Sequence, residues 1–170
     1  MKKLMRIMTT VLVFSMLMSM AATAAPSPTK VRRTYRSYVL RNLKKSKYPY
    51  RKTRYYDINK DGIKELIVSY EAGVRIAYQF YTYHNGRVKK MHKSDFYGCN
   101  GISAMTNNRK YICITQSNGA SDSSETIYKI SNRKLKKVAT YRMKGNRVYR
   151  NGKRVSKSKI RAVWRHQMPI

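Results

Sequence analysis

Three of the seven acidic residues in this 170-residue chain fall within the short segment from Asp57 to Glu65. The segment reads Asp-Ile-Asn-Lys-Asp-Gly-Ile-Lys-Glu. Side-chain oxygens at alternate positions of a tight loop can converge on one hard cation. The glycine that follows them permits the sharp turn, and the next carbonyl adds a ligand. The sequence therefore predicts a calcium loop with ligands from Asp57, Asn59, Asp61, the Ile63 carbonyl and Glu65.

The same segment also fits a plain turn, in which Asp and Asn side chains bond to their own backbone and Gly62 takes a positive φ. An EF-hand is not expected, because Val68 stands where that motif needs a bidentate glutamate and the flanks have strand-like sequences. Lys60 and Lys64 dilute the negative charge, so the expected affinity is weak, on the order of 10⁻⁴ to 10⁻³ M. Such a site fits a structural calcium ion better than a calcium sensor.

Other reactive side chains do not form a recognised catalytic pattern. The three histidines are scattered, and the chain has no GxSxG, HExxH or phosphate-binding loop. The polar segment 117–125, which contains Asp122 and Glu125, fits a solvated connection better than a binding loop. We therefore expect a protein that is not an enzyme, with a hydrolase that uses acids around Asp122 as the alternative.

The two cysteines, Cys99 and Cys113, lack the CxxC spacing of redox and zinc motifs. A disulfide between them would close a loop of about 15 residues and contribute roughly 3 kcal/mol in the chain-entropy model. Cys113 also lies in the apolar run 111–114, where a free buried thiol fits equally well. The sequence leaves both alternatives open.

The chain carries 38 basic residues against 7 acidic ones, for a formal net charge of +31. Such a surface concentrates polyanions in a salt-dependent way. The expected partner is an anionic polymer or surface, such as a cell-wall polymer or anionic lipid, with nucleic acid as a non-specific ligand. A cationic, membrane-active protein is a further alternative. The oligomeric state is not determined by the sequence.

The N-terminal segment indicates where the protein works. A short basic stretch precedes an apolar run of about a dozen residues that closes on Ala22-Thr23-Ala24, as in a cleaved secretory signal. Because a bilayer span needs roughly 20 apolar residues, no transmembrane segment is expected in the mature form. We expect a signal peptide at 1–25, a linker at 26–30 and one secreted domain at 31–170. That domain would be extracellular, free or associated with the cell surface.

Two helices are expected, one near each end of the domain. Apolar residues from Val31 to Leu43 recur at helical spacing with Lys and Arg between them. This spacing predicts an amphipathic helix that ends before Pro49. Near the C-terminus, Ser156 is expected to cap a short helix that carries Trp164 as a core anchor.

Between the helices, period-two patterns and turn residues predict antiparallel strands. Asn85-Gly86 gives the clearest hairpin signal, and before it Tyr78 and Phe80 share one face while Tyr81 lies on the other. The expected fold class is α+β: an antiparallel β meander with an N-terminal amphipathic helix and a short C-terminal helix. The expected strand segments are 54–56, 65–70, 75–84, 87–91, 102–105, 111–115, 126–130 and 135–141, with a short hairpin around 151–152.

The loop has a specific resemblance. Its pattern DxNxDGxxEL between two strands resembles the calcium loop of integrin-type propeller repeats, the FG-GAP repeats. In those loops the side chains at the first, third, fifth and ninth positions are ligands. The resemblance implies the same ligands as the spacing does, namely the side chains of Asp57, Asn59, Asp61 and Glu65 and the carbonyl of Ile63.

A wider resemblance covers about residues 35–141. The segments 55–68, 80–88 and 127–130 resemble a family of small secreted or lipid-anchored proteins of Gram-positive gut bacteria, which carry no assigned activity. Lys64 stands where that family often has proline, a change that leaves the expected ligands unaltered. We therefore expect a secreted, strongly basic, non-enzymatic domain with a structural calcium loop, which binds an anionic cell-surface or extracellular polymer.

Overall fold

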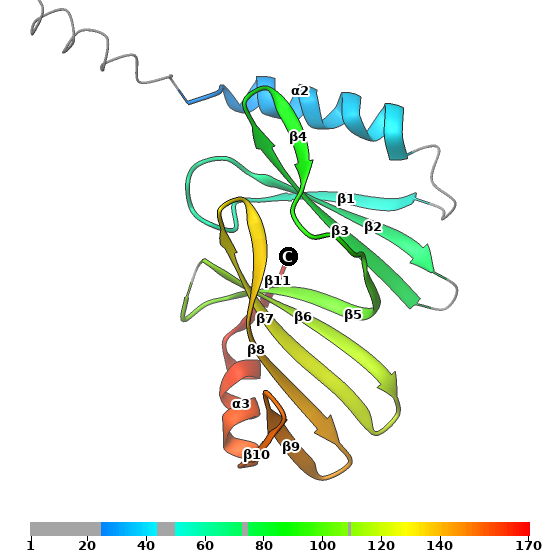
Figure 1. Cartoon of the computed structure of the whole chain (residues 1–170), viewed down its shortest axis with the longest axis vertical. Coiled ribbons are helices and arrows are strands. Elements are labelled where there is room, and N and C mark those ends of the chain that lie inside the picture. The colour runs from blue at the N-terminus through cyan, green and yellow to red at the C-terminus, as the bar shows by residue number, and fades with distance from the viewer. Residues whose placement is uncertain (1–24, 44–49, 73–74, 109) are drawn as a thin grey trace, which may run out of the picture.

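The computed structural model of the chain describes residues 25–43, 50–72, 75–108 and 110–170. All but the last residue of the expected signal peptide lies outside the described residues, as does Pro49. Within the described ranges, eleven strands form one antiparallel sheet, and a helix lies near each end of it (Figure 1). The mostly β, antiparallel architecture with an N-terminal and a short C-terminal helix is the one expected. No helix in the described ranges is both long and apolar enough to cross a membrane.

The N-terminal helix α2 spans Pro28–Tyr38 and continues as a π-helical turn, η1, at Val39–Leu43. It begins at Pro28 rather than Val31, so most of the segment 26–30 is helix and the expected linker is wrong there. Ser27 Oγ accepts a hydrogen bond from the Lys30 backbone N–H at 3.3 Å. Pro28 fits the first helical position because its missing N–H would have no partner there. The start of the helix is therefore set by Ser27 and Pro28 rather than by the first apolar residue.

The strands follow one another across the sheet in the order β1-β2-β3-β5-β6-β7-β8-β9-β10. Two strands lie off this path: β4 pairs with β3, and β11 returns after helix α3 (Lys157–Arg165) to pair with β5. The strands are β1 (Tyr50–Tyr56), β2 (Glu65–Ala72), β3 (Arg75–His84), β4 (Arg87–Lys90), β5 (Phe96–Met105), β6 (Tyr111–Gly119), β7 (Asp122–Ser131), β8 (Lys134–Lys144), β9 (Arg147–Arg150), β10 (Lys153–Val155) and β11 (Gln167–Pro169).

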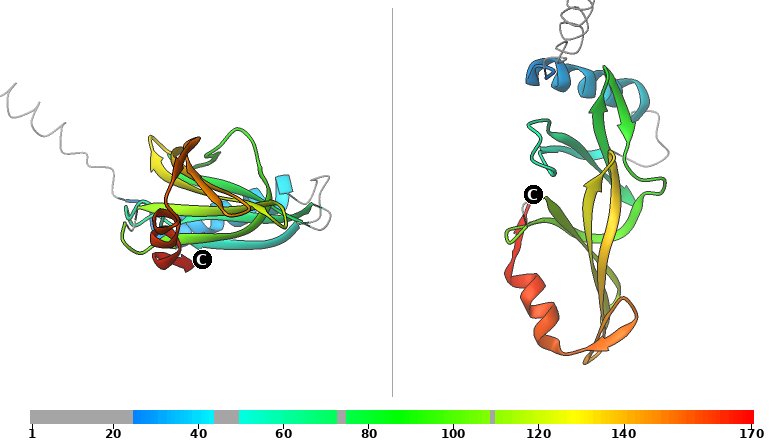
Figure 2. Two further views of the ribbon diagram at one scale, coloured as in Figure 1. Left: turned by 90° about the horizontal axis from the view of Figure 1, so that it is seen from below. Right: turned by 60° about the vertical axis from the view of Figure 1, so that its left-hand side comes forward.

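Strand β3 has two partners along one of its edges. Ile76 and Tyr78 pair with β5, whereas the segment from Tyr81 to His84 pairs with β4. The Asn85-Gly86 turn joins β3 to β4 with the positive φ values of 47° and 77° that its sequence predicts. The sheet thus has an N-terminal part beneath α2 and a C-terminal part beside α3, at opposite ends of the molecule (Figure 2).

Three apolar clusters stabilise this sheet, and the two faces of a strand contribute to different clusters. Leu66 and Val68 of β2 face α2, whereas Ile67 between them faces the other side. Tyr78 and Phe80 share a cluster, and Tyr81 lies in another, as the alternation predicts. The α2 core is Val31, Tyr35, Leu43, Leu66, Val68, Tyr70, Ala77, Tyr81 and Tyr83. The middle core contains Ile58, Ile67, Tyr78, Phe80, Cys99, Ile112 and Ile114, among others. The α3 core is Met105, Cys113, Ile127, Ala139, Tyr141, Val148, Ile160 and Val163.

Of two local expectations about the C-terminal helix, one is met in part and one fails. Ser156 is the N-cap residue of α3, as expected, but its side chain makes no capping hydrogen bond and instead contacts Ser158 Oγ at 2.7 Å. Trp164 is 41% exposed, so it is not a core anchor. Ile160 and Val163 supply the buried face of α3 instead, because they point at the sheet from the same side of the helix.

Candidate functional site

The segment 57–65 connects β1 to β2, and Tyr56 and Glu65 are paired across these two strands. The pairing brings both ends of the segment together and forces the chain between them into a tight loop. Asp57 Oδ1 accepts a hydrogen bond from the Asp61 backbone N–H at 3.2 Å, and Oδ2 accepts one from Gly62 at 3.0 Å. Gly62 has φ +85°, a conformation that L side chains rarely adopt. The first aspartate therefore organises the turn of the loop.

Glu65 closes the loop from inside the protein, with only 1% of its surface exposed. Its Oε2 accepts a hydrogen bond from the Ile58 backbone N–H at 3.0 Å, and its Oε1 accepts one from Thr82 Oγ1 at 3.4 Å. Burial, together with the nearby negative charges of Asp61 and Asp57, raises the pKa of Glu65 to about 8. A proton or a cation would therefore lower the free-energy cost of burying this carboxyl group.

Asn59 adds an oxygen that lacks a partner. Its Nδ2 donates a hydrogen bond to Asp61 Oδ2 at 2.7 Å, which fixes the orientation of the amide. Its Oδ1 is then buried, and no group in the described ranges donates a hydrogen bond to it. Buried acceptors without partners are rare in folded proteins, and an amide oxygen is a good calcium ligand.

The loop geometry is compatible with both alternatives that the sequence leaves open. The backbone hydrogen bonds to Asp57, and one from Ile63 to Asp61 Oδ1 at 2.8 Å, are those of a plain turn. Each carboxylate oxygen keeps a further lone pair, so these bonds do not exclude a cation. In the described part of the chain, no three His, Cys, Asp or Glu side chains gather as a metal cluster. A cation in this loop would therefore need Asn59 and a backbone carbonyl as well as the acids.

Glu125 forms a second buried polar centre, which the sequence did not predict. The segment 117–125 is not a solvated connection but a hairpin between β6 and β7, and it places Glu125 at 6% exposure. Its Oε2 accepts hydrogen bonds from Thr115 Oγ1 at 2.9 Å, Cys113 Sγ at 3.1 Å and Gln167 Nε2 at 3.1 Å. Its Oε1 accepts one from Trp164 Nε1 at 3.2 Å. These donors come from β6, α3 and β11, so Glu125 ties the C-terminal elements to the sheet.

Asp122, the other acid of the segment 117–125, and Asp95 are held in ion pairs. Asp122 accepts hydrogen bonds from two nitrogens of Arg142, and this guanidinium lowers the pKa of the carboxyl. Asp95 pairs with Lys90 and also accepts a hydrogen bond from Gln79 Nε2 at 2.6 Å. The pKa of each carboxyl is lowered, whereas a general acid at neutral pH needs a carboxyl that a raised pKa keeps protonated.

The two cysteines are free and buried, so of the two alternatives that the sequence leaves open the structure has the free thiols. On the paired strands β5 and β6, Cys99 lies opposite Gln116, whereas Cys113 lies opposite Ser103. Cys99 belongs to the middle core and Cys113 to the α3 core, so their side chains leave the sheet on different sides. Burial raises the pKa of the Cys99 thiol to about 12, and burial and the Glu125 charge raise that of Cys113. Both thiols are therefore inert core groups.

Comparison with known proteins gives no family for this chain. No protein-family model, no curated protein and no solved structure matches it. The function must therefore be argued from the loop at 57–65, from the distribution of charge and from the surface of the described residues.

Proposed function

We propose that this protein is an exported, non-enzymatic domain that binds an anionic polymer and carries a structural calcium ion in the loop at 57–65. The observation that carries the proposal is where the acidic residues lie. Three are in the loop, Glu125 is buried among neutral donors, and Glu71 is exposed. The remaining two, Asp95 and Asp122, form the two ion pairs found among the described residues. Almost none of the positive charge is neutralised within the protein.

A polyanion is the partner that this charge distribution favours. A chain with 38 basic and 7 acidic residues repels itself, and an extended anionic polymer relieves that repulsion over many sites at once. The arrangement of Asp122 and Glu125 supports the non-enzymatic interpretation, because Asp122 is paired with Arg142 and Glu125 is buried among protein donors of hydrogen bonds. Binding through exposed charges should weaken steeply as salt is added.

The calcium part of the proposal is supported by the unpaired Asn59 Oδ1, in the same loop that carries Asp57, Asp61 and Glu65. A cation would give that oxygen a partner and would offset the charge that makes the burial of Glu65 costly. Lys60 lies over the Tyr56 ring, with Nζ 4.9 Å from its centroid, and therefore does not occupy the loop. The proposed ion stiffens the β1–β2 connection.

In the same proposal, α2 is an amphipathic helix that turns its basic face outward. Val31 and Tyr35 are buried against the sheet, whereas Arg32, Arg33 and Arg36 are exposed. The helix then has two roles, since one face completes the α2 core and the other presents guanidinium groups to the polymer.

Retention on immobilised polyphosphate tests the proposed polymer binding, with neutral dextran as the matched matrix. The mature chain should be retained on polyphosphate at low salt and released at high salt, and it should pass through dextran in both conditions. Equal behaviour on the two matrices, or retention that salt does not change, would contradict a charge-driven polymer partner.

A further inference from the structure

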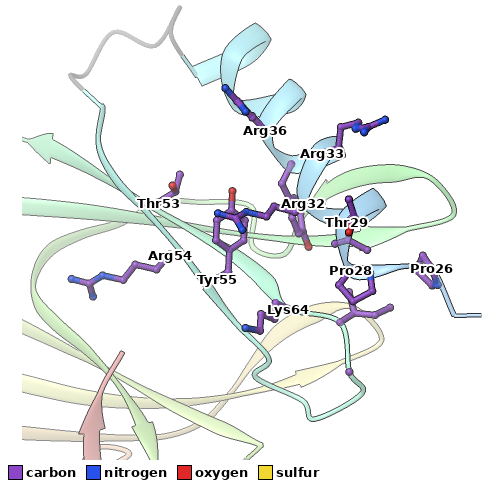
Figure 3. Close-up of a pocket in the computed structure, with 14 residues that line it drawn as sticks. Pro26, Pro28, Thr29, Arg32, Arg33, Arg36, Thr53, Arg54, Tyr55 and Lys64 are labelled. Atoms are coloured by element: carbon purple, nitrogen blue, oxygen red, sulfur yellow. The ribbon is translucent and has the colours of Figure 1, made fainter.

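A groove of about 1030 Å³ lies between α2, β1 and the end of the loop at 57–65 (Figure 3). Five basic side chains line it and no acidic ones do. They come from segments far apart in sequence: Arg32, Arg33 and Arg36 from α2, Arg54 from β1 and Lys64 from the loop. The fold has thus collected positive charge around one concave surface.

The basic side chains of the groove do not all have the same freedom. Arg54 is already engaged within the protein, because its Nη1 donates a hydrogen bond to the Ile170 carbonyl oxygen. Arg32 reaches from α2 toward Tyr55, and its guanidinium carbon lies 6.0 Å from the centroid of that ring (Figure 3). Arg36 and Lys64 are exposed. Arg32, Arg36 and Lys64 therefore present charge from two sides of the groove.

The walls of the groove are fixed by the α2 core. Tyr35 of α2 is fully buried, and its ring centroid lies 6.0 Å from that of Tyr55 and 6.5 Å from that of Tyr83. Ile63, at the end of the loop, packs against the same core. Because the helix, the strand and the loop share one core, the groove is already formed before a ligand binds. Binding there costs less conformational entropy than binding to flexible lysine side chains on an open surface.

We propose that this groove binds a segment of a phosphate-bearing polymer chain, with Arg32, Arg36 and Lys64 as its contacts. This inference rests on the proposed function, and it assigns polymer binding to one place on the protein. Guanidinium groups pair with phosphate oxygens through two parallel N–H donors, which favours phosphate. The volume is at the upper end of small-ligand pockets, which are about 300–1,000 Å³, so several linked phosphates fit better than one.

The chain offers a closely matched control on its other helix. Arg161 and Arg165 of α3 have the same spacing along a helix as Arg32 and Arg36 of α2, and all four side chains are exposed. Each pair places its second arginine in the last turn of its helix. Replacing either pair by glutamine removes the same charge from equivalent helical positions, but only one pair lines the groove.

The experiment measures the Kd of the mature chain for inorganic polyphosphate of defined length, by calorimetry at fixed ionic strength. The double variant Arg32→Gln/Arg36→Gln should bind at least tenfold more weakly, since losing even one charge-assisted contact of about 1.5–3 kcal/mol has that effect. The double variant Arg161→Gln/Arg165→Gln should stay within about twofold of the parent, because exposed charges outside the site act only through the screened long-range field. Lys64→Gln, which alters no helix, should weaken binding in the same direction as the α2 variant.

The outcomes separate the groove from the broader proposal. If the α2 and α3 double variants weaken polyphosphate binding equally and Lys64→Gln does not change the Kd, the groove is not the binding site. That result would leave polymer binding by the whole surface intact. No binding of the parent chain to polyphosphate would overturn the proposed function itself. A poly-L-glutamate chain tested in parallel should bind more weakly than polyphosphate. Equally tight binding of poly-L-glutamate that depends on Arg32 and Arg36 would overturn the assignment to phosphate.

Discussion

Glu65 Oε2 accepts a hydrogen bond from the Ile58 backbone N–H at 3.0 Å, so the last residue of the 57–65 loop is tied to its second residue. Both residues are almost fully buried, and the Ile58 side chain is part of the middle core. The loop is therefore anchored to the protein at both ends before any ion binds. A bound cation would change the charge balance of the loop more than its path.

Calcium should raise the melting temperature of the mature chain. If calcium is present at about ten times its Kd and binds only the folded state, the gain is about 1.4 kcal/mol, or roughly 3–6 °C for a domain of this size. Asp61→Ala should abolish the increase, because it removes one acid and the acceptor of the Asn59 amide hydrogen bond. Asp95→Asn, outside the loop, should retain it. Identical melting temperatures of the parent chain in calcium and in chelator would contradict the calcium site.

In chelator, the stability of the protein should fall as the pH rises from about 4.5 to 8. Burial, with the charges of Asp61 and Asp57, raises the pKa of Glu65 from 4.5 to about 8 in the folded state. The folded chain therefore holds a proton that the unfolded chain has lost in this window. The contribution is fully present below the unfolded pKa and is lost as the pH passes the folded one.

The measurement is a series of thermal melts in chelator across this pH window, for the parent chain and for Glu65→Gln. The amide cannot ionise and keeps the shape of the protonated acid, so its melting temperature should depend much less on pH between these limits. Parallel pH profiles for the two proteins would show that Glu65 does not titrate as its surroundings require.

Removing the Glu125 carboxylate should destabilise the C-terminal half of the sheet. Glu125→Ala leaves donors of Trp164, Gln167 and Thr115 without their acceptor, at an expected cost of about 2–4 kcal/mol. Denaturant unfolding followed by the fluorescence of Trp164, the single tryptophan, reports on this region directly. Asp122→Asn, which breaks only the exposed pair with Arg142, should cost about 1 kcal/mol or less. Equal costs for the two variants would argue against the tie to α3 and β11.

Both cysteines should remain reduced and protected in the folded protein. Native protein should resist alkylation by iodoacetamide near neutral pH, because burial raises the pKa of each thiol and hides it from reagent. Unfolded protein should take up two labels. Intact mass spectrometry without reductant checks the same point, since a mass lower by two hydrogens would reveal a disulfide that the register of β5 and β6 does not allow.

The sequence alone determined features that depend on neighbouring residues. The tight turn at Asn85-Gly86 follows from residues that tolerate positive φ, and the alternation along β3 follows from the period of an extended chain. The clustering of acids at 57–65 in a basic chain was equally visible, and the structure places them in one loop between two paired strands. These features need no information about distant segments.

The limits of the sequence appear where the local pattern is interrupted. The first half of β5 was missed because Gly98 takes a φ of +68° and a bulge falls between Cys99 and Gly101, which breaks the period of two. The polar residues before Glu125 gave no strand signal, although pairing with β6 and β8 makes them one strand.

Only the tertiary structure decided which residues from distant segments meet. Glu125 is buried because α3 and β11 return to cover β6 and β7, and no local pattern shows that return. The cysteines are separated because the register of β5 and β6 sends them to opposite faces. Arg32 and Lys64 line one groove because the α2 core packs a helix against a loop that lies far along the chain. Composition fixed the amount of positive charge, whereas long-range strand pairing and helix packing determined where that charge lines a concave surface.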